Sequence, residues 1–161
     1  MSLHEQSVGK TDEWYTPSYV FEAMGCRFDV DVASPGLLVT PWIPASDFIL
    51  SGSLTRVWQG FVWMNPPFGG RNGIVPWLDK FRSHGAGVAL VPDRTSAPWW
   101  QDAARVMHRI LFVAPKIQFI GADGKPGRSP AQGTALMAMG IKGVQALRVA
   151  QANGLGIGMT P

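Results

Sequence analysis

The residues of this chain whose types and spacing could do chemistry form a short turn, Asn65-Pro66-Pro67-Phe68. The turn follows an apolar run over 61–64, so it stands where a predicted strand ends. Two consecutive prolines fix φ at both positions, and the first of them pushes Asn65 toward extended geometry. An amide side chain, a backbone carbonyl and an aromatic ring are therefore expected in a preset arrangement.

This arrangement could activate an exocyclic amine on adenine, whose lone pair is otherwise delocalised into the ring. The Asn65 side-chain oxygen and the Pro66 carbonyl can each accept one amino hydrogen, which aims the lone pair at an electrophilic methyl group. Phe68 can stack on the base, a contact worth ~1–3 kcal/mol, and a base in a duplex must be flipped out to reach it. The competing interpretation is an ordinary loop, because Asn-Pro pairs commonly begin turns.

Acidic side chains on a second predicted strand could bind an adenosine cofactor. Asp29 and Asp31 alternate with apolar residues over 28–32. A carboxylate near the end of a strand can accept hydrogen bonds from the two ribose hydroxyls, and Asp31 is nearer that end. The alternative for at least one of the two is a solvent-facing position. Asp47 is a weaker candidate for a contact with the cofactor's adenine and fits a surface loop equally well.

The chain lacks the glycine-rich strand-to-helix loop that would normally cradle such a cofactor. Gly154-Leu155-Gly156-Ile157-Gly158 has the glycines, but no predicted strand precedes it, and we expect it to be a tail. Cofactor binding must then depend on another segment. The aromatic and polar run Trp14-Tyr15-Thr16-Pro17 is the best candidate.

Alternating strands and helices must position these residues. Apolar patterns predict strands over 28–32, 47–50, 61–64, 88–91, 109–113, 116–120 and 134–139, and helices over 17–24, 73–83, 97–107 and 141–152. This order predicts an α/β domain with a mostly parallel sheet flanked by helices. In such sheets ligands bind beyond the carboxyl ends of the strands, so the acids of 28–32, the turn 65–68 and the polar turn 92–94 should converge there.

The boundaries follow from the same patterns. Pro17 should open the first helix, with Thr16 as its capping residue. We expect one domain over 13–153, a flexible polar arm over 1–12 and a C-terminal tail over 154–161.

Composition narrows the class of protein. The hydrophobic fraction of 46% and the length of 161 residues favour one folded domain with a real core. The net charge of +3 permits a polyanionic partner without requiring one. A single cysteine and three scattered histidines suggest neither a disulfide framework nor a metal site. No apolar run could span a membrane and no signal peptide is evident, so we expect a cytoplasmic protein with no membrane partner.

The order of several motifs resembles the small phage-type DNA N6-adenine methyltransferases. The motifs are Glu13-Trp14-Tyr15-Thr16-Pro17, Phe28-Asp29-Val30-Asp31, Trp63-Met64-Asn65-Pro66-Pro67-Phe68, Leu90-Val91-Pro92, Trp99-Trp100 and Lys116-Ile117-Gln118-Phe119. They occur in the family's order over about residues 13–139. The turn alone is shared with other amino methyltransferases, whereas the combined order is much more specific.

The resemblance implies a Rossmann-like, S-adenosylmethionine-dependent methyltransferase fold, with adenine in DNA as the methyl acceptor and a bacterial or phage-infected cell as its setting. It implies a catalytic role for Asn65, Pro66, Pro67 and Phe68. It implies cofactor contacts from Tyr15, Thr16, Pro17 and Asp31, with Asp29 as a further candidate. The sequence departs from the family pattern in two places: Ala114-Pro115 replace a Gly-Arg pair before Lys116, and Phe68 replaces a tyrosine.

Two other functions remain open at this stage. The same chemistry could act on RNA or on a protein glutamine amide, which also presents an NH₂ group. The missing glycine-rich loop also leaves room for a non-catalytic nucleic-acid-binding module on the same fold. The recognition sequence and the oligomeric state do not follow from the sequence.

Overall fold

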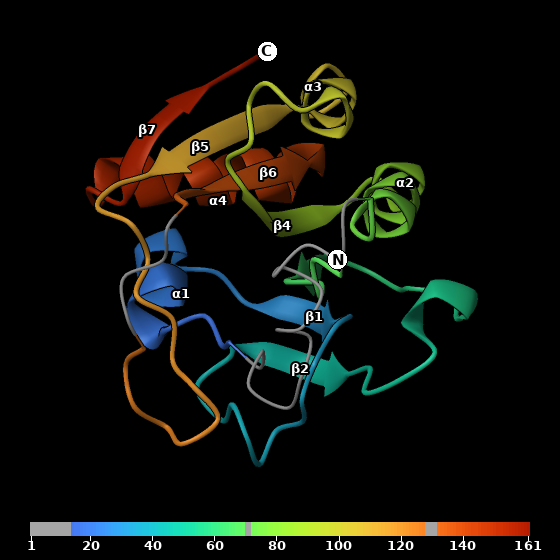
Figure 1. Ribbon diagram of the computed structural model, residues 1–161, viewed down its shortest axis with the longest axis vertical. Coiled ribbons are helices and arrows are strands. Elements are labelled where there is room, and N and C mark those ends of the chain that lie inside the picture. The colour runs from blue at the N-terminus through green and yellow to red at the C-terminus, as the bar shows by residue number, and fades with distance from the viewer. Residues whose placement is uncertain (1–13, 70–71, 128–131) are drawn as a thin grey trace, which may run out of the picture.

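A seven-stranded sheet with the order β2-β1-β3-β4-β6-β5-β7 forms the centre of the protein (Figure 1). The computed structural model describes residues 14–69, 72–127 and 132–161, so the predicted arm over 1–12 lies outside the described residues. The strands are β1 (Phe28–Asp31), β2 (Ala45–Phe48), β3 (Val62–Met64), β4 (Gly87–Pro92), β5 (Arg109–Val113), β6 (Thr134–Met139) and β7 (Gly156–Met159).

The sheet is parallel on one side and antiparallel on the other. Strands β2, β1, β3 and β4 pair in parallel. Strand β6 lies between β4 and β5 and runs opposite to both, and β7 runs opposite to β5. The prediction of a mostly parallel sheet is therefore wrong for the second half. A short, fully buried strand such as β6 has the same apolar sequence in either direction, so its pattern could not reveal this.

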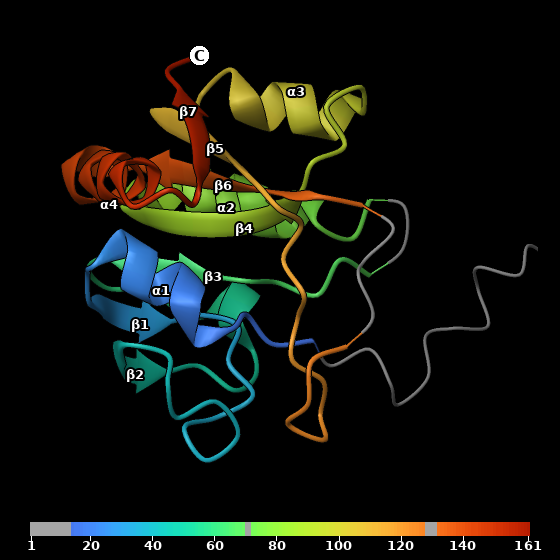
Figure 2. The same cartoon turned by 90° about the vertical axis from the view of Figure 1, so that its left-hand side faces the viewer.

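Helices cover both faces of the sheet (Figures 1 and 2). They are α1 (Ser18–Met24), α2 (Val75–His84), α3 (Pro98–Ala104) and α4 (Gly140–Ala152), with a 3₁₀ turn η1 (Ser53–Thr55). All four predicted helices are confirmed. Helices α1 and α4 pack on one face, and α2 and α3 pack on the other. No helix within the described ranges is long and apolar enough to cross a membrane.

The start of α1 differs from the prediction. Pro17, with extended backbone geometry, is the N-cap residue, and no side chain caps the helix. Thr16 is therefore not the helix cap that the sequence predicted. Its hydroxyl instead accepts a hydrogen bond from Asn65 Nδ2 at 3.2 Å.

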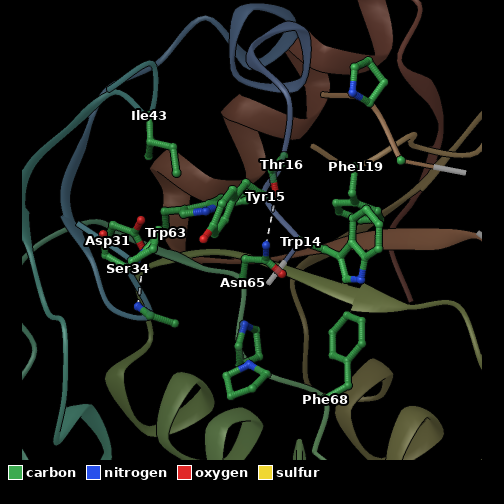
Figure 3. Close-up of a pocket in the computed structure, with 16 residues that line it drawn as sticks. Trp14, Tyr15, Thr16, Asp31, Ser34, Ile43, Trp63, Asn65, Phe68 and Phe119 are labelled. Carbon is green, nitrogen blue, oxygen red and sulfur yellow. Dashed lines mark hydrogen bonds between the residues drawn. The ribbon is translucent and has the colours of Figure 1, made fainter. Parts of the chain in front are cut away.

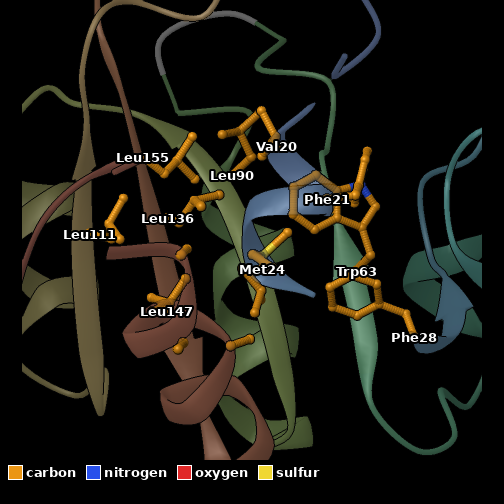
Figure 4. Close-up of a cluster of buried hydrophobic side chains, with 14 of the residues drawn as sticks. Val20, Phe21, Met24, Phe28, Trp63, Leu90, Leu111, Leu136, Leu147 and Leu155 are labelled. Atoms are coloured by element: carbon orange, nitrogen blue, oxygen red, sulfur yellow. The ribbon is translucent and has the colours of Figure 1, made fainter. Parts of the chain in front are cut away.

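Two apolar clusters hold the helices to the sheet. The cluster under α1 and α4 contains Phe21 and Trp63, whose rings meet edge to face with their centroids 4.8 Å apart (Figure 4). The cluster on the opposite face includes Phe81 of α2 and Trp100 of α3. Trp63, which directly precedes the Met64-Asn65 step, is 1% exposed, so this core fixes the end of β3.

The predicted strand over 116–120 is wrong. Within this segment only Ile120 forms β-bridges, one to Tyr15 and one to Pro126. Ile117 is nevertheless fully buried. The apolar alternation therefore reflects burial of single side chains, while the backbone pairs locally instead of joining the sheet.

The predicted C-terminal tail contains a strand instead. Gly156–Met159 forms β7, which pairs with β5 from Val113 opposite Gly156 to Ile110 opposite Met159. A β-carbon at Gly156 would overlap the Phe112 carbonyl, so glycine permits this close approach. Leu155, just before the strand, is 5% exposed and belongs to the cluster under α1 and α4.

We predict that Leu155→Ala lowers the free energy of unfolding by about 2–5 kcal/mol, because it leaves a cavity in a packed cluster. The matched variant Ile157→Ala, at a side chain that is 73% exposed, should change it by less than about 0.5 kcal/mol. Urea unfolding followed by circular dichroism measures both. Equal effects of the two variants would contradict the structural role given to this end of the chain.

Candidate functional site

A cavity of about 860 Å³ lies at the carboxyl ends of β1 and β3 (Figure 3). Strand β1 lies between β2 and β3 in the sheet, so the chain passes from β1 to β2 on one side of β1 and then to β3 on its other side. Open α/β sheets bind ligands at such a switch point. The cavity is lined by Trp14, Tyr15, Thr16, Asp31, Ala33, Ser34, Pro35, Ile43, Trp63, Asn65, Pro66, Pro67, Phe68, Phe119, Pro126 and Gly127.

The Asn65 amide has a defined orientation. Its nitrogen donates to the Thr16 hydroxyl at 3.2 Å, and Figure 3 shows its oxygen turned away from Thr16. Among the hydrogen bonds formed within the described residues, none uses this oxygen or the Pro66 carbonyl. Both residues line the cavity, and these two acceptors on one turn are thus left for a ligand.

Thr16 is itself held firmly. Its side chain is buried, and its carbonyl accepts a hydrogen bond from Trp42 Nε1 at 2.8 Å. The neighbouring Tyr15 exchanges two backbone hydrogen bonds with Ile120, at 2.8 and 2.9 Å. The segment that anchors Asn65 is therefore tied to two other parts of the chain.

A buried carboxylate occupies the end of β1. Asp31 is 1% exposed, and it accepts hydrogen bonds from the Ala33 N–H at 3.2 Å and from the Ser34 hydroxyl. Burial raises the pKa of Asp31 to about 6, although these two hydrogen bonds act to lower it. Such a carboxylate is well suited to accept hydrogen bonds from paired hydroxyl groups of a ligand.

Aromatic rings form another part of the cavity. Phe68 stands on the turn after β3, and Trp14 and Phe119 come from two distant segments. Residues 119–127 fold back on themselves through hydrogen bonds from the Gly127 N–H to the Phe119 carbonyl, 2.8 Å, and from the Gly121 N–H to the Lys125 carbonyl, 2.9 Å. We call this segment the 119–127 hairpin.

Three predicted cofactor residues do not line the cavity. The exposed Asp29 accepts a hydrogen bond from the Phe61 N–H at 2.7 Å. The exposed Asp47 accepts one from the N–H of its neighbour Phe48 at 2.8 Å. Pro17 is buried at the start of α1. The structure does bring together Tyr15, Thr16, Asp31 and the turn 65–68.

The polar turn after β4 does not line the cavity, so of the three strand ends expected to converge, those of β1 and β3 meet there and that of β4 does not. Asp93 is not among the residues that line the cavity. Its backbone N–H donates a hydrogen bond to the Gly133 carbonyl at 3.1 Å. Arg94 donates to Gln132 Oε1 at 2.9 Å. Strand β4 lies between β3 and β6, one position beyond the pair β1 and β3, whose ends line the cavity.

Several lining residues were not predicted as site residues. Ser34 could have been found, since a hydroxyl three residues after a strand-terminal acid can hydrogen-bond to it. Trp63 reads as a core residue, which it also is. Phe119 and Gly127 reach the cavity only because the 119–127 hairpin folds beside Tyr15, and no local pattern announces that contact.

Comparison with known proteins adds a family match. A family model described as DNA N-6-adenine-methyltransferase (Dam) matches residues 4–146, a range that includes all sixteen residues lining the cavity. No curated protein and no solved structure matched the chain.

We predict that Asp31 makes the ligand-free protein less stable as pH rises. Its pKa is raised in the fold, so the folded protein holds this proton more tightly than the unfolded chain does. The free energy of unfolding should fall as pH rises from about 4 to above 6, by roughly 2–3 kcal/mol for this group.

Urea unfolding of the wild type and Asp31→Asn across this pH range isolates that contribution. The variant should lack the loss and be the more stable protein at pH 7. A constant difference between the two proteins from pH 4 to 7 would contradict the raised pKa.

Proposed function

The chain belongs to the DNA N-6-adenine-methyltransferase (Dam) family, and we propose that it transfers a methyl group from S-adenosylmethionine to the N6 amine of adenine in DNA. The observation that carries this proposal is the orientation of Asn65. Its nitrogen donates to Thr16, and its oxygen has no partner among the described residues, so that oxygen can accept a hydrogen bond from a ligand. An amide oxygen is the acceptor that an amine requires.

The turn residues act on the target amine. Asn65 Oδ1 and the Pro66 carbonyl accept one amino hydrogen each, which draws the nitrogen toward tetrahedral geometry and directs its lone pair into the cavity. Pro66 and Pro67 limit the backbone freedom of the turn, so these acceptors need little reordering when the base arrives. Phe68, 40% exposed, offers a ring face for stacking on the base.

The polar groups at the end of β1 fit an adenosine-containing cofactor. Asp31 is buried, lines the cavity and can accept hydrogen bonds from two adjacent ribose hydroxyls. Ile43 and Trp63 supply apolar surface beside it. When bound, S-adenosylmethionine supplies an electrophilic methyl group, so this chain needs no side-chain nucleophile. Binding here would not depend on a glycine-rich loop.

The substrate must present its adenine outside the base stack. The acceptors of the turn line a cavity at the end of a sheet, where a base inside a duplex cannot reach them. We therefore propose that the target adenine is flipped out of the duplex or comes from a single strand. The excess of basic residues, net +3, favours association with such a polyanion.

We predict that Asn65→Ala lowers the rate of methyl transfer by at least about 100-fold while the protein stays folded, because the substitution removes one of the two acceptors for the amine. Mass spectrometry of nucleosides from DNA incubated with protein and S-adenosylmethionine measures N6-methyladenine. Thr16→Val should cost less, about tenfold, by freeing the amide to rotate. Thr16→Ser, which keeps the hydroxyl, is its matched control. Near-normal transfer by Asn65→Ala would refute the catalytic assignment.

We predict that Asp31→Asn weakens binding of S-adenosylhomocysteine by about tenfold or more at pH 7.5, because it removes a charged acceptor. Asp29→Asn, on the same strand but outside the cavity, should leave binding within about twofold. Isothermal titration calorimetry measures both. Wild-type affinity should also fall as the pH drops below about 6, where Asp31 becomes protonated. An equal loss of S-adenosylhomocysteine affinity in both variants would contradict the placement of the cofactor beside Asp31.

A further inference from the structure

We propose that Trp14 forms the second wall of a slot for the target adenine, opposite Phe68. The inference rests on the proposed function and extends it to Trp14, which the sequence placed in the run expected to hold the cofactor and which we assign instead to the substrate. It gives the flipped base two aromatic partners instead of one.

The cavity has two chemically different ends. Figure 3 shows Asp31, Ser34 and Ile43 on one side of Asn65, and Trp14, Phe119 and Phe68 on the other. The first end carries the buried carboxylate. The second end has three aromatic rings, and no acidic residue of the cavity lining lies there, whereas Trp63 and Tyr15 lie beside Asp31 at the first end. A methyl donor at the first end and an acceptor base at the second would place Asn65 between them.

Trp14 and Phe68 share the features expected of two walls. Their side chains are 44% and 40% exposed, yet both line the cavity, so each has a free surface that faces it. They come from segments far apart in the sequence. In Figure 3 the Asn65 amide oxygen points toward the space beside these two rings. A base stacked there would bring its amino group to the oxygen that Thr16 leaves available.

The fold holds the indole in place on its other side. The six-membered part of the Trp14 ring lies against Gly127, where an added β-carbon would overlap it, and 3.6 Å from the β-carbon position of Gly121. Both glycines belong to the 119–127 hairpin, which the Tyr15–Ile120 hydrogen bonds fasten to the same segment as Trp14. A ring packed on backbone in this way can serve as a rigid wall.

Two aromatic walls would restrain the target base more tightly than one. A single ring restrains a base on one face and leaves it free to tilt, whereas a slot fixes the base plane and thus the direction of its amino hydrogens. Stacking accepts any base, so selectivity for adenine would come from the two acceptors on the turn. In this arrangement Trp14 is a substrate-binding residue that does not contact the cofactor.

The test compares wild type, Trp14→Ala, Trp14→Phe and the control Tyr19→Ala. Tyr19 is 45% exposed, which matches Trp14, but lies outside the cavity. Single-turnover methyl transfer is measured on genomic DNA that lacks N6-methyladenine, at DNA concentrations below saturation. S-adenosylhomocysteine binding is measured by calorimetry, and thermal unfolding by circular dichroism.

We expect Trp14→Ala to slow transfer by roughly 10- to 100-fold, as the loss of one base–aromatic stack predicts. Its S-adenosylhomocysteine affinity should stay within about twofold of the wild type, Trp14→Phe should recover most of the rate, and Tyr19→Ala should match the wild type. A comparable loss of S-adenosylhomocysteine binding in Trp14→Ala would assign the indole to the cofactor and overturn the slot.

Unchanged transfer by Trp14→Ala beside an active wild type would also overturn the slot and leave the proposed function standing. An inactive wild type that binds S-adenosylhomocysteine would instead overturn DNA methylation, and the slot with it. If Trp14→Ala does not fold, Gly127→Ala tests the same wall, because its added β-carbon displaces the Trp14 ring without removing it. This variant should also slow methyl transfer.

Discussion

The hydrogen bond from Asn65 Nδ2 to Thr16 Oγ1 is the interaction on which the site depends. It joins the turn after β3 to a segment 49 residues earlier in the chain. An unanchored asparagine could present either its nitrogen or its oxygen to a ligand, and only the oxygen can accept an amine hydrogen. With its nitrogen bonded to Thr16, Asn65 leaves its oxygen to a ligand, which is the orientation that the proposed reaction requires. The contacts of Trp42 and Ile120 around Tyr15-Thr16 fix this anchor, so segments that do not contribute to the turn still hold Asn65 in place.

At the Asp31 end of the cavity, burial of an ionisable side chain costs folding free energy, and a bound polar ligand could offset this cost. Asp31 is buried with two hydrogen bonds, and its raised pKa means that the folded protein resists holding it charged. A residue kept for stability alone would not be ionisable here, because a neutral side chain would avoid the desolvation penalty. A ligand with two hydroxyl groups would restore the lost hydration. Stability and affinity are thus opposed at one residue, as is common where a site is prepared for a polar ligand.

The sequence predicted the parts of this protein that depend on local patterns. The helices, most strands and the turn 65–68 follow from apolar periodicity and from proline geometry, and the turn and Asp31 do meet at one cavity. It failed where the outcome depends on distant pairing. The direction of β6, the inclusion of Gly156–Met159 in the sheet and the position of Asp29 are all set by neighbours far along the chain. Short buried strands and glycines carry little information about such neighbours.

The division of the sheet explains how the cavity forms without a glycine-rich loop. The parallel half supplies the strand ends that carry Asp31 and Asn65, and it must stay open at that edge for a ligand. The strands of the antiparallel half contribute no residue to the cavity lining. There β5, β6 and β7 pair closely, and the chain between β5 and β6 is free to cross to the parallel half as the 119–127 hairpin. That crossing delivers Phe119 and Gly127 to the cavity and backs the ring of Trp14. The wall that a glycine-rich loop would build from adjacent residues is built here from segments that the sheet topology brings together.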